Sequence, residues 1–185
     1  LEVGVAHDGV WLGGGGPTPN GRMTYPNFPT EEVFTTPVAG ATSGTFRCTT
    51  PLSFNGRVID GIAGAFARGR LTRIDASRPS DRELLSRTFA TDSGAGRLGE
   101  VALVDDSSRI GQAGRIYGET LLDENAASHI AFGNGFGGTR SAGGRINRSV
   151  IHIDVMIGSR DVSVFGTRAR GRDTPIIVDG EWLLN

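Results

Sequence analysis

One histidine and one aspartate interrupt an apolar run at Val150–Ile157. The run predicts a β-strand, because it is short and rich in β-branched residues. Alternate residues of a strand point to the same face, so His152 and Asp154 should lie side by side, about 7 Å apart along the strand. A histidine and a carboxylate are costly to bury without a partner. The spacing therefore indicates a metal site, with a His–Asp hydrogen bond or an exposed strand face as the alternatives.

A second group of ligand-forming side chains lies at Asp123–His129, where two acids are followed by a histidine. We expect a helix from Tyr117 to about Ser128. In an unbroken helix Glu124 and His129 would lie about 140° apart, so they could bind one ion only if the helix ends between them. Solvated helix acids and a buried structural histidine are the alternative interpretations.

Further acids stand where they could join such a site. Glu31 and Glu32 are adjacent in a proline-rich segment that cannot form a long regular element. Glu100 opens the apolar run Glu100–Val104, which predicts a buried strand. Two histidines with several carboxylates suit a pair of divalent cations such as zinc, cobalt or manganese. The remaining histidine, His7, lies in a predicted turn and is expected at the surface.

The elements that must position these residues are mostly short strands. Asn55-Gly56 and Arg68-Gly69 are turn sequences between apolar segments and predict two β-hairpins. A helix is expected at Ser80–Ala90, with Ser80 as the capping residue and Glu83 completing a capping box. Together the segments predict an α+β fold, a β-rich domain with a mixed or antiparallel sheet and a few short helices. The other expected elements are a glycine-rich loop at Gly133–Gly144 and a last hairpin from Val162 to Leu183 that turns near Asp179-Gly180.

Length and composition are those of a globular domain. The 185 residues suit one domain over residues 1–185, and 37% hydrophobic with 21% charged residues exclude a disordered tail. A formal net charge of −1 leaves no large electrostatic footprint for nucleic acid or an anionic membrane, so neither is expected as a partner. The single Cys48 excludes internal disulfides and a cysteine-based metal site, and it predicts a cytoplasmic location.

Five motifs follow one another along the chain, and together they resemble one known family. They are Pro26–Pro37, Pro51–Gly56, Arg97–Val104, Leu122–His129 and Ser149–Gly158. In this order they closely resemble the signatures of the thermophilic aminopeptidase T family, which includes the AmpS and PepS aminopeptidases. The resemblance covers nearly the whole chain. Members of the family are typically longer, so the resemblance implies that this chain is their C-terminal catalytic half and that the N-terminal domain is absent from it.

The family consists of dinuclear metallo-exopeptidases, so the resemblance implies two divalent metal ions. Glu31 and Glu32 both match its catalytic Thr-Glu-Glu motif, and we favour Glu31 as the metal ligand and Glu32 as the base or a structural acid. Glu100 matches the family's bridging glutamate. The other implied ligands are Glu124 and His129 for the second ion and His152 and Asp154 for the first.

One position departs from the family pattern. The family has a tyrosine seven residues after the histidine that matches His129, where this sequence has Phe136. A phenol could donate a hydrogen bond to a tetrahedral oxyanion, and a phenyl ring cannot. The departure implies that another group takes this role or that peptidase activity is weaker.

The resemblance implies a metal-dependent aminopeptidase that releases N-terminal amino acids from a peptide substrate with a free N-terminus, and also a homodimer. The first alternative is a mononuclear non-heme iron ring-cleaving dioxygenase related to this family, which would need two histidines and one carboxylate on one iron. His129, His152 and Asp154 could supply them, but a mononuclear site would not need Glu100 or the two adjacent glutamates. The second alternative is a non-catalytic metal-binding domain or fragment.

Overall fold

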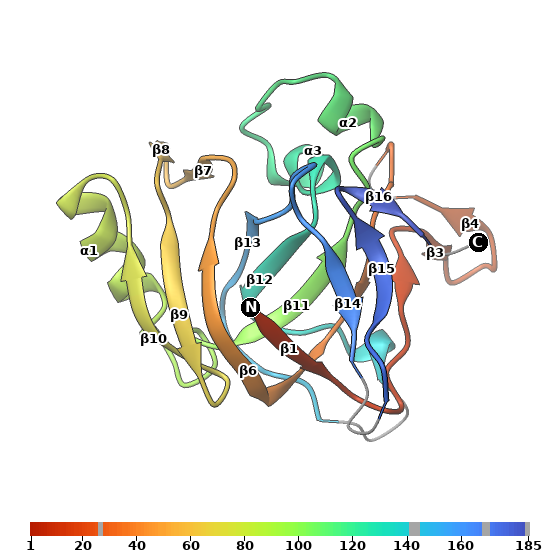
Figure 1. Cartoon of the computed structure of the whole chain (residues 1–185), viewed down its shortest axis with the longest axis horizontal. Helices are drawn as coiled ribbons and strands as arrows, with labels where there is room; N and C mark the ends of the chain where they lie inside the picture. Colours follow the sequence, from red (N-terminus) through yellow and green to blue (C-terminus); the bar gives the residue numbers. More distant parts are fainter. Residues whose placement is uncertain (26–27, 141–144, 168–170, 184–185) are drawn as a thin grey trace.

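Short antiparallel strands make up most of the computed structural model, which describes residues 1–25, 28–140, 145–167 and 171–183 (Figure 1). The α+β prediction is confirmed, because a few short helices accompany several antiparallel sheets. The helices are α1 (Pro79–Thr88), α2 (Arg109–Gln112), α3 (Thr120–Asp123) and the 3₁₀ helices η1 (Glu124–Ala126) and η2 (Gly137–Thr139).

Two larger sheets form the body of the molecule. The first has the strand order β1-β6-β9-β10, and the second has the order β13-β12-β11-β5-β2. Three smaller sheets, β14-β15-β16, β3-β4 and β7-β8, extend them. The strands are β1 (Glu2–Val5), β2 (Leu12–Gly13), β3 (Gly16–Pro17), β4 (Met23–Thr24), β5 (Val33–Thr35), β6 (Pro37–Arg47), β7 (Leu52–Phe54), β8 (Arg57–Ile59), β9 (Ala63–Ala67), β10 (Arg70–Asp75), β11 (Leu98–Leu103), β12 (His129–Gly133), β13 (His152–Met156), β14 (Val164–Gly166), β15 (Thr174–Val178) and β16 (Glu181–Trp182).

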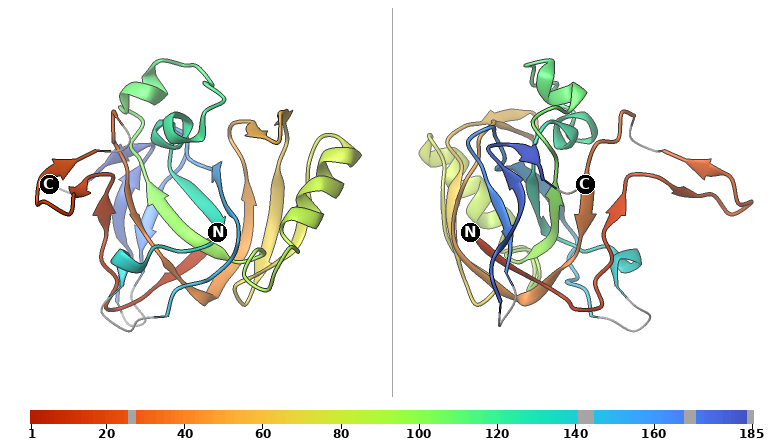
Figure 2. Two further views of the ribbon diagram at one scale, coloured as in Figure 1. Left: turned by 180° about the vertical axis from the view of Figure 1, so that it is seen from behind. Right: turned by 45° about the vertical axis from the view of Figure 1, so that its right-hand side comes forward.

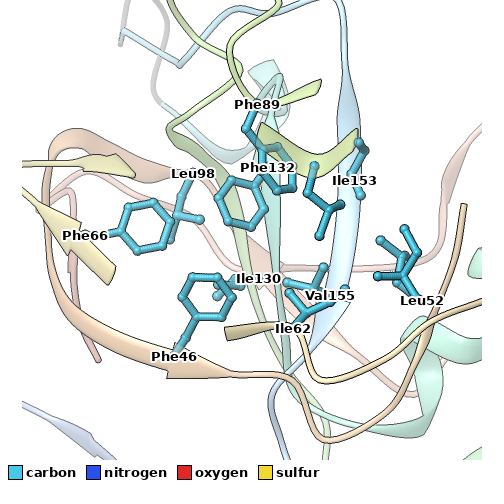
Figure 3. Close-up of a cluster of buried hydrophobic side chains, with 12 residues drawn as sticks. Phe46, Leu52, Ile62, Phe66, Phe89, Leu98, Ile130, Phe132, Ile153 and Val155 are labelled. Atoms are coloured by element: carbon cyan, nitrogen blue, oxygen red, sulfur yellow. The ribbon is translucent and has the colours of Figure 1, made fainter. Parts of the chain in front are cut away.

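The apolar core lies between the two larger sheets and is centred on Phe132 of β12 (Figure 3). Phe132 is fully buried, and its ring stacks on Phe89 with the ring centroids 4.0 Å apart. Phe46 of β6 and Phe66 of β9 approach the same ring from the other sheet, with centroid distances of 5.8 and 5.5 Å. The core therefore joins the sheet that carries the candidate ligands to its neighbour.

The predicted hairpin turns are present, and all three carry the positive φ angles that this type of turn requires. Asn55 and Gly56 connect β7 to β8 with φ values of 50° and 70°. Arg68 and Gly69 connect β9 to β10 with φ values of 50° and 71°. The turn at 179–180 joins β15 to β16, so the expected last hairpin is part of a three-stranded sheet.

The helix expected at Ser80–Ala90 is α1, but its start was predicted wrongly. The helix begins at Pro79, and its N-cap is Arg78, which makes no side-chain capping bond. Ser80 therefore lies inside the first turn and does not cap the helix. Proline is favoured at the first helical position because its fixed φ suits the helix and its missing N–H would have no partner there.

The helix expected from Tyr117 to Ser128 is shorter and broken. Helix α3 covers Thr120–Asp123, η1 follows it directly, and Ala127 is extended, with φ −160° and ψ 156°. His129 then begins strand β12. The break between Glu124 and His129, which joint binding of one ion requires, is therefore present.

The β3-β4 hairpin projects from the body of the molecule (Figure 2). Of the expected glycine-rich loop, Gly133 closes β12 and Gly137–Thr139 form η2, while residues 141–144 lie outside the described residues. Across the described part of the chain, no helix is long and apolar enough to cross a membrane.

Candidate metal centre

The two faces of strand β12 have different surroundings: one packs against the apolar core, and the other belongs to a polar face of the second sheet. Ile130 and Phe132 are fully buried on the core side, so the alternate residues His129 and Ala131 face the other way. Ala131 pairs with Glu100 of β11 on one side and with Asp154 of β13 on the other. Because its side chain is small, it leaves space between the two carboxylates.

The candidate ligands form two groups that share Glu100. In the first, the His129 Nε2 lies 3.3 Å from Glu32 Oε2 and 4.0 Å from Glu100 Oε1. In the second, the His152 Nε2 lies 3.2 Å from Glu100 Oε2 and 3.2 Å from Asp154 Oδ1. Within each group the ligand atoms all lie within 4.8 Å of one another. Glu100 thus presents one oxygen to each group, which is the arrangement of a bridging carboxylate.

Backbone carbonyls orient both imidazole rings. The Nδ1 of His129 is 3.1 Å from the Ala127 oxygen, and the Nδ1 of His152 is 2.8 Å from the Asn134 oxygen. Since a carbonyl only accepts, each Nδ1 carries the proton and each Nε2 faces the carboxylates. A metal-ligating histidine typically has this arrangement, with its second nitrogen held by an outer partner.

Three buried atoms of the cluster lack hydrogen-bond partners within the described part of the chain. They are Glu32 Oε2, His129 Nε2 and Asp154 Oδ1. Buried polar atoms are nearly always satisfied, and an atom left unpaired costs about 1–3 kcal/mol. Carboxylate oxygen and imidazole nitrogen are ligands that suit zinc, cobalt or manganese. The donor set and its unpaired atoms therefore fit a divalent cation.

The electrostatics of the cluster are dominated by burial and by its own charges. Burial lowers the pKa of each histidine, but the neighbouring carboxylates outweigh it and raise the pKa of His129 to about 9 and of His152 to about 11. Burial raises the pKa of Glu124 to about 8, with the charge of Glu32 adding to the effect. It also raises the pKa of Glu100. Burial raises the pKa of Asp154, but its interactions with His152 and the charge of His129 together outweigh burial, so the pKa is lowered.

The structure places the two adjacent glutamates differently from the sequence-based preference for Glu31. Glu32 is buried in the first group, whereas Glu31 belongs to neither group. The Glu31 Oε2 instead accepts a hydrogen bond of 2.6 Å from the backbone N–H of Arg109. Successive residues of an extended segment point in opposite directions, so only one of the pair can enter the site. The geometry favours Glu32 as the ligand.

Glu124 lies beside the cluster but in neither group of three. It is buried at the start of η1 and lines the same cavity as Glu32, Glu100 and Asp154. The exposed His7 lies in a turn away from the cluster, as expected. Four of the six predicted ligands therefore line one cavity, His129 joins them through the group that it forms with Glu32 and Glu100, and Glu31 does neither.

The cluster opens into a cavity of about 730 Å³. Its apolar wall comes from distant parts of the chain: Leu12, Phe34, Leu52, Phe54, Leu121, Phe136 and Ile153. Its charged side chains are the four carboxylates Glu32, Glu100, Glu124 and Asp154 together with His152, and no arginine lines it among the described residues. Figure 1 shows that α3 lies at one end of β11, β12 and β13, and its residues Thr120 and Leu121 line the cavity.

A family model described as Thermophilic metalloprotease (M29) matches residues 1–182 of the sequence. The chain belongs to this family. The resemblance to the aminopeptidase T family is thereby confirmed. Aminopeptidase T of Thermus aquaticus is 40% identical over 194 residues, which covers 100% of this chain and 47% of that protein. Aminopeptidase 2 of Geobacillus stearothermophilus is 40% identical over 183 residues, covering 94% and 44%.

A solved structure of the M29 family has the same fold. Wild-type AmpT from Thermus thermophilus superimposes with a TM-score of 0.92 at 41% identity, covering 98% of this chain and 47% of that one. The chain therefore spans about half the length of the relatives it matches.

Phe136, where the family resemblance predicts a tyrosine, lies at the candidate centre. Its ring centroid is 5.1 Å from that of His152, edge to face, and 5.1 Å from that of Phe34. The phenyl ring packs against a candidate ligand and offers no hydrogen-bond donor there.

Sequence reasoning missed several residues of the candidate centre. Asn134 holds His152 through a backbone carbonyl, which no side-chain pattern could reveal. Phe34 and Leu52 reach the cavity wall only through the fold. The fully buried Asn125 could have been found from the sequence, because it stands next to Glu124 inside a motif of the family resemblance.

Proposed function

We propose that the protein is a metal-dependent aminopeptidase that hydrolyses the first peptide bond of peptides with a free N-terminus. The observation that carries this proposal is the pair of ligand groups sharing Glu100 at the wall of a cavity of about 730 Å³. The M29 family membership supports it, as do the aminopeptidase names of relatives at 40% identity.

Two divalent cations, such as zinc, cobalt or manganese, would occupy the two groups. One would be held by Glu32, Glu100 and His129, with Glu124 as a further ligand. The other would be held by Glu100, together with His152 and Asp154, which complete its group. When bound, such ions supply a hydroxide at neutral pH and polarise the scissile carbonyl. This assignment replaces Glu31 by Glu32 as a ligand.

The chain's own residues account for the remaining steps. An oxygen of a cavity carboxylate would accept a hydrogen bond from the substrate's free α-amino group, which a peptide has only at its first residue, and so favour exopeptidase cleavage. Glu32 has two oxygens, so Oε2 can face an ion while the other carries a proton from the water to the leaving amine. Because Phe136 donates no hydrogen bond, the developing oxyanion has no phenol there to stabilise it. The side chain of the first residue would pack against the apolar wall.

The iron dioxygenase alternative receives less support from the geometry. It needs His129, His152 and Asp154 on one ion, but these three do not form a group within 4.8 Å in the described part of the chain. The two histidines instead face opposite oxygens of Glu100. This arrangement favours two ions over one.

Metal stoichiometry and turnover test the proposal together. The purified chain is reloaded with zinc or cobalt, its metal is counted by elemental mass spectrometry, and it is then incubated with leucine anilide. About two ions per chain and release of the anilide are expected. One iron with oxygen consumption would support the dioxygenase. Two ions without turnover of any peptide would support a non-catalytic metal-binding domain.

Assembly and location follow from the same proposal. We propose a cytoplasmic protein, because its single cysteine fits a reducing compartment. The homodimer implied by the family resemblance is part of the proposal, and sedimentation or light scattering of the purified chain tests it.

A further inference from the structure

Asn125 ties together two segments that each carry a candidate ligand. Its side chain is fully buried, its Oδ1 accepts a hydrogen bond of 2.7 Å from the Glu31 backbone N–H, and its Nδ2 donates to the Leu121 oxygen at 3.2 Å. Glu31 precedes Glu32, and Asn125 follows Glu124. The carboxamide thus joins residues 94 positions apart, each next to a carboxylate of the cavity.

The Glu31 carboxylate adds a third segment to this tie. Its Oε2 accepts from the Arg109 backbone N–H at 2.6 Å, where helix α2 begins. The Arg109 guanidinium is 3.8 Å away on a side chain that is 79% exposed, so the backbone bond is the stronger connection. Ser108, the N-cap of α2, connects α2 back to η1, because its hydroxyl donates a hydrogen bond of 3.4 Å to the Ala126 oxygen. The segment before β5, the start of α2 and η1 are therefore joined in one hydrogen-bonded ring.

We propose that Glu31 and Asn125 are positioning residues that hold Glu32 and Glu124 in place and thereby set the affinity of the ion bound with His129. Neither lines the cavity, and both act on a ligand that is their neighbour along the chain. The inference rests on the proposed two-ion site. It gives Glu31 an outer role in place of the ligand role that the sequence suggested.

The hydrogen-bonded ring should affect the ion bound with His129 more than the ion bound with His152. Glu100 and Asp154 lie within the paired strands β11 and β13, and the sheet holds both. Glu32 stands just before the three-residue strand β5, and Glu124 stands on the three-residue helix η1. Glu32 lies outside the residue pairs that β5 forms with β11 and β2, and a single 3₁₀ turn has few hydrogen bonds of its own, so regular secondary structure fixes neither carboxylate. Breaking the ring should therefore loosen the Glu32–Glu124 side and leave the Glu100–Asp154 side in place.

Titration of the metal-free chain with Co²⁺ alone tests the inference, with bound metal counted and the cobalt absorption spectrum recorded. Wild type and Glu31→Gln, which keeps an acceptor for the Arg109 N–H, should bind two ions. Glu31→Ala and Asn125→Leu should bind the second ion about 10–100-fold more weakly, as expected for loss of an outer partner. Asp81→Asn is the matched control, since Asp81 is a buried carboxylate paired with two arginines outside the cavity. It should bind two ions even if it lowers the melting temperature.

The outcomes separate this inference from the proposed function. Equal binding of two ions by wild type, Glu31→Ala and Asn125→Leu would overturn the inference alone. Loss of the second ion in Glu31→Gln would overturn it too, because the charge of Glu31 would then matter as it does in a ligand. Fewer than two ions in wild type would contradict both proposals. Two ions in wild type without peptidase activity would contradict only the proposed function. If Asn125→Leu does not fold, Glu31→Ala still tests the inference. The Glu31 side chain is 20% exposed, so its removal should disturb the fold less than replacement of the fully buried Asn125.

Discussion

At the scale of single residues, the position of Glu100 between the two groups decides how the centre should respond to mutation. Its two oxygens face different histidines, at 4.0 and 3.2 Å. Glu100→Gln should therefore weaken the binding of both ions, whereas His152→Ala should weaken the binding of only one. Elemental analysis of the two variants after reloading checks this difference. A glutamine variant that still retains two ions would show that Glu100 does not bridge.

Binding of the ions should release protons, because both histidines are protonated in the metal-free chain. Their Nδ1 atoms are held by carbonyls, so each Nε2 must lose its proton to bind a metal. With the pKa of His129 raised to about 9 and that of His152 to about 11, each binds a proton at pH 7.5. Lowering the pH should therefore weaken metal binding, by about tenfold per released proton and pH unit. Calorimetry in PIPES and HEPES measures the protons, and identical heats in both buffers would contradict the prediction.

The sequence predicted which side chains lie close together better than it predicted the direction in which each one points. The His152–Asp154 pair could be predicted because strand periodicity alone puts both on one face, and side-chain reach then brings their ligand atoms to 3.2 Å. The choice between Glu31 and Glu32 could not be made in this way. Both are glutamates in an irregular segment, and only contacts with Arg109 and His129, far away in the sequence, determine which one enters the site.

At the scale of elements, local signals were reliable where the backbone itself is constrained. The Asn55-Gly56 and Arg68-Gly69 turns need positive φ, and both residues of each pair have it. The start of α1 was less predictable, because Ser80 and Pro79 are both good starting signals and proline took the first position. The break before His129 depends on pairing of β12 with its neighbours, which no local pattern contains.

Asp92 anchors the segment that leads into β13. Its carboxylate accepts from the backbone N–H groups of Gly94, Ala95 and Val150 and from the Ser149 hydroxyl. The Val150 bond contributes most to lowering the pKa of Asp92. A lowered pKa stabilises the fold above the unfolded value near 3.8, and this stabilisation is lost as the pH falls through the folded value. Asp92→Asn should lower the melting temperature at pH 7, and the gap from wild type should shrink below pH 4, which is about the unfolded value. A gap that is the same at both pH values would contradict this role.

The two faces of strand β12 should allow a mutation to change the stability of the core without changing the candidate site. Phe132 lies on the opposite face from His129 and Ala131, packed among three other rings. Phe132→Ala should lower the free energy of unfolding by about 3–5 kcal/mol, the usual cost of deleting a buried phenyl ring. Chemical denaturation measures the loss. Phe132→Leu, which fills more of the space, should lose less, and equal losses would contradict a packing role.

At the scale of the whole molecule, the cavity is assembled from segments that the sequence gives no reason to combine. Leu12 belongs to β2, Leu52 and Phe54 to the β7-β8 hairpin and Leu121 to α3. The sequence shows that each of these segments contains apolar residues. That the segments meet around one cavity depends on how the sheets pack. The proposed substrate-binding surface is therefore the feature that sequence analysis could not predict, although the candidate ligands beside it could be named.

This cavity predicts discrimination against acidic N-terminal residues. Its walls are apolar and no arginine lines it among the described residues, so a glutamate side chain of the first residue would lose its hydration there without gaining a cationic partner. The chain should therefore hydrolyse leucine anilide at least about tenfold more efficiently than glutamate anilide, which corresponds to about 1.4 kcal/mol in kcat/KM. Leu121→Arg places a cation at the wall, on a side chain that is 53% exposed and so tolerant of change. The variant should raise kcat/KM for the glutamate anilide relative to kcat/KM for the leucine anilide. Equal turnover of both anilides by the wild-type chain would mean that the first side chain does not bind against this wall.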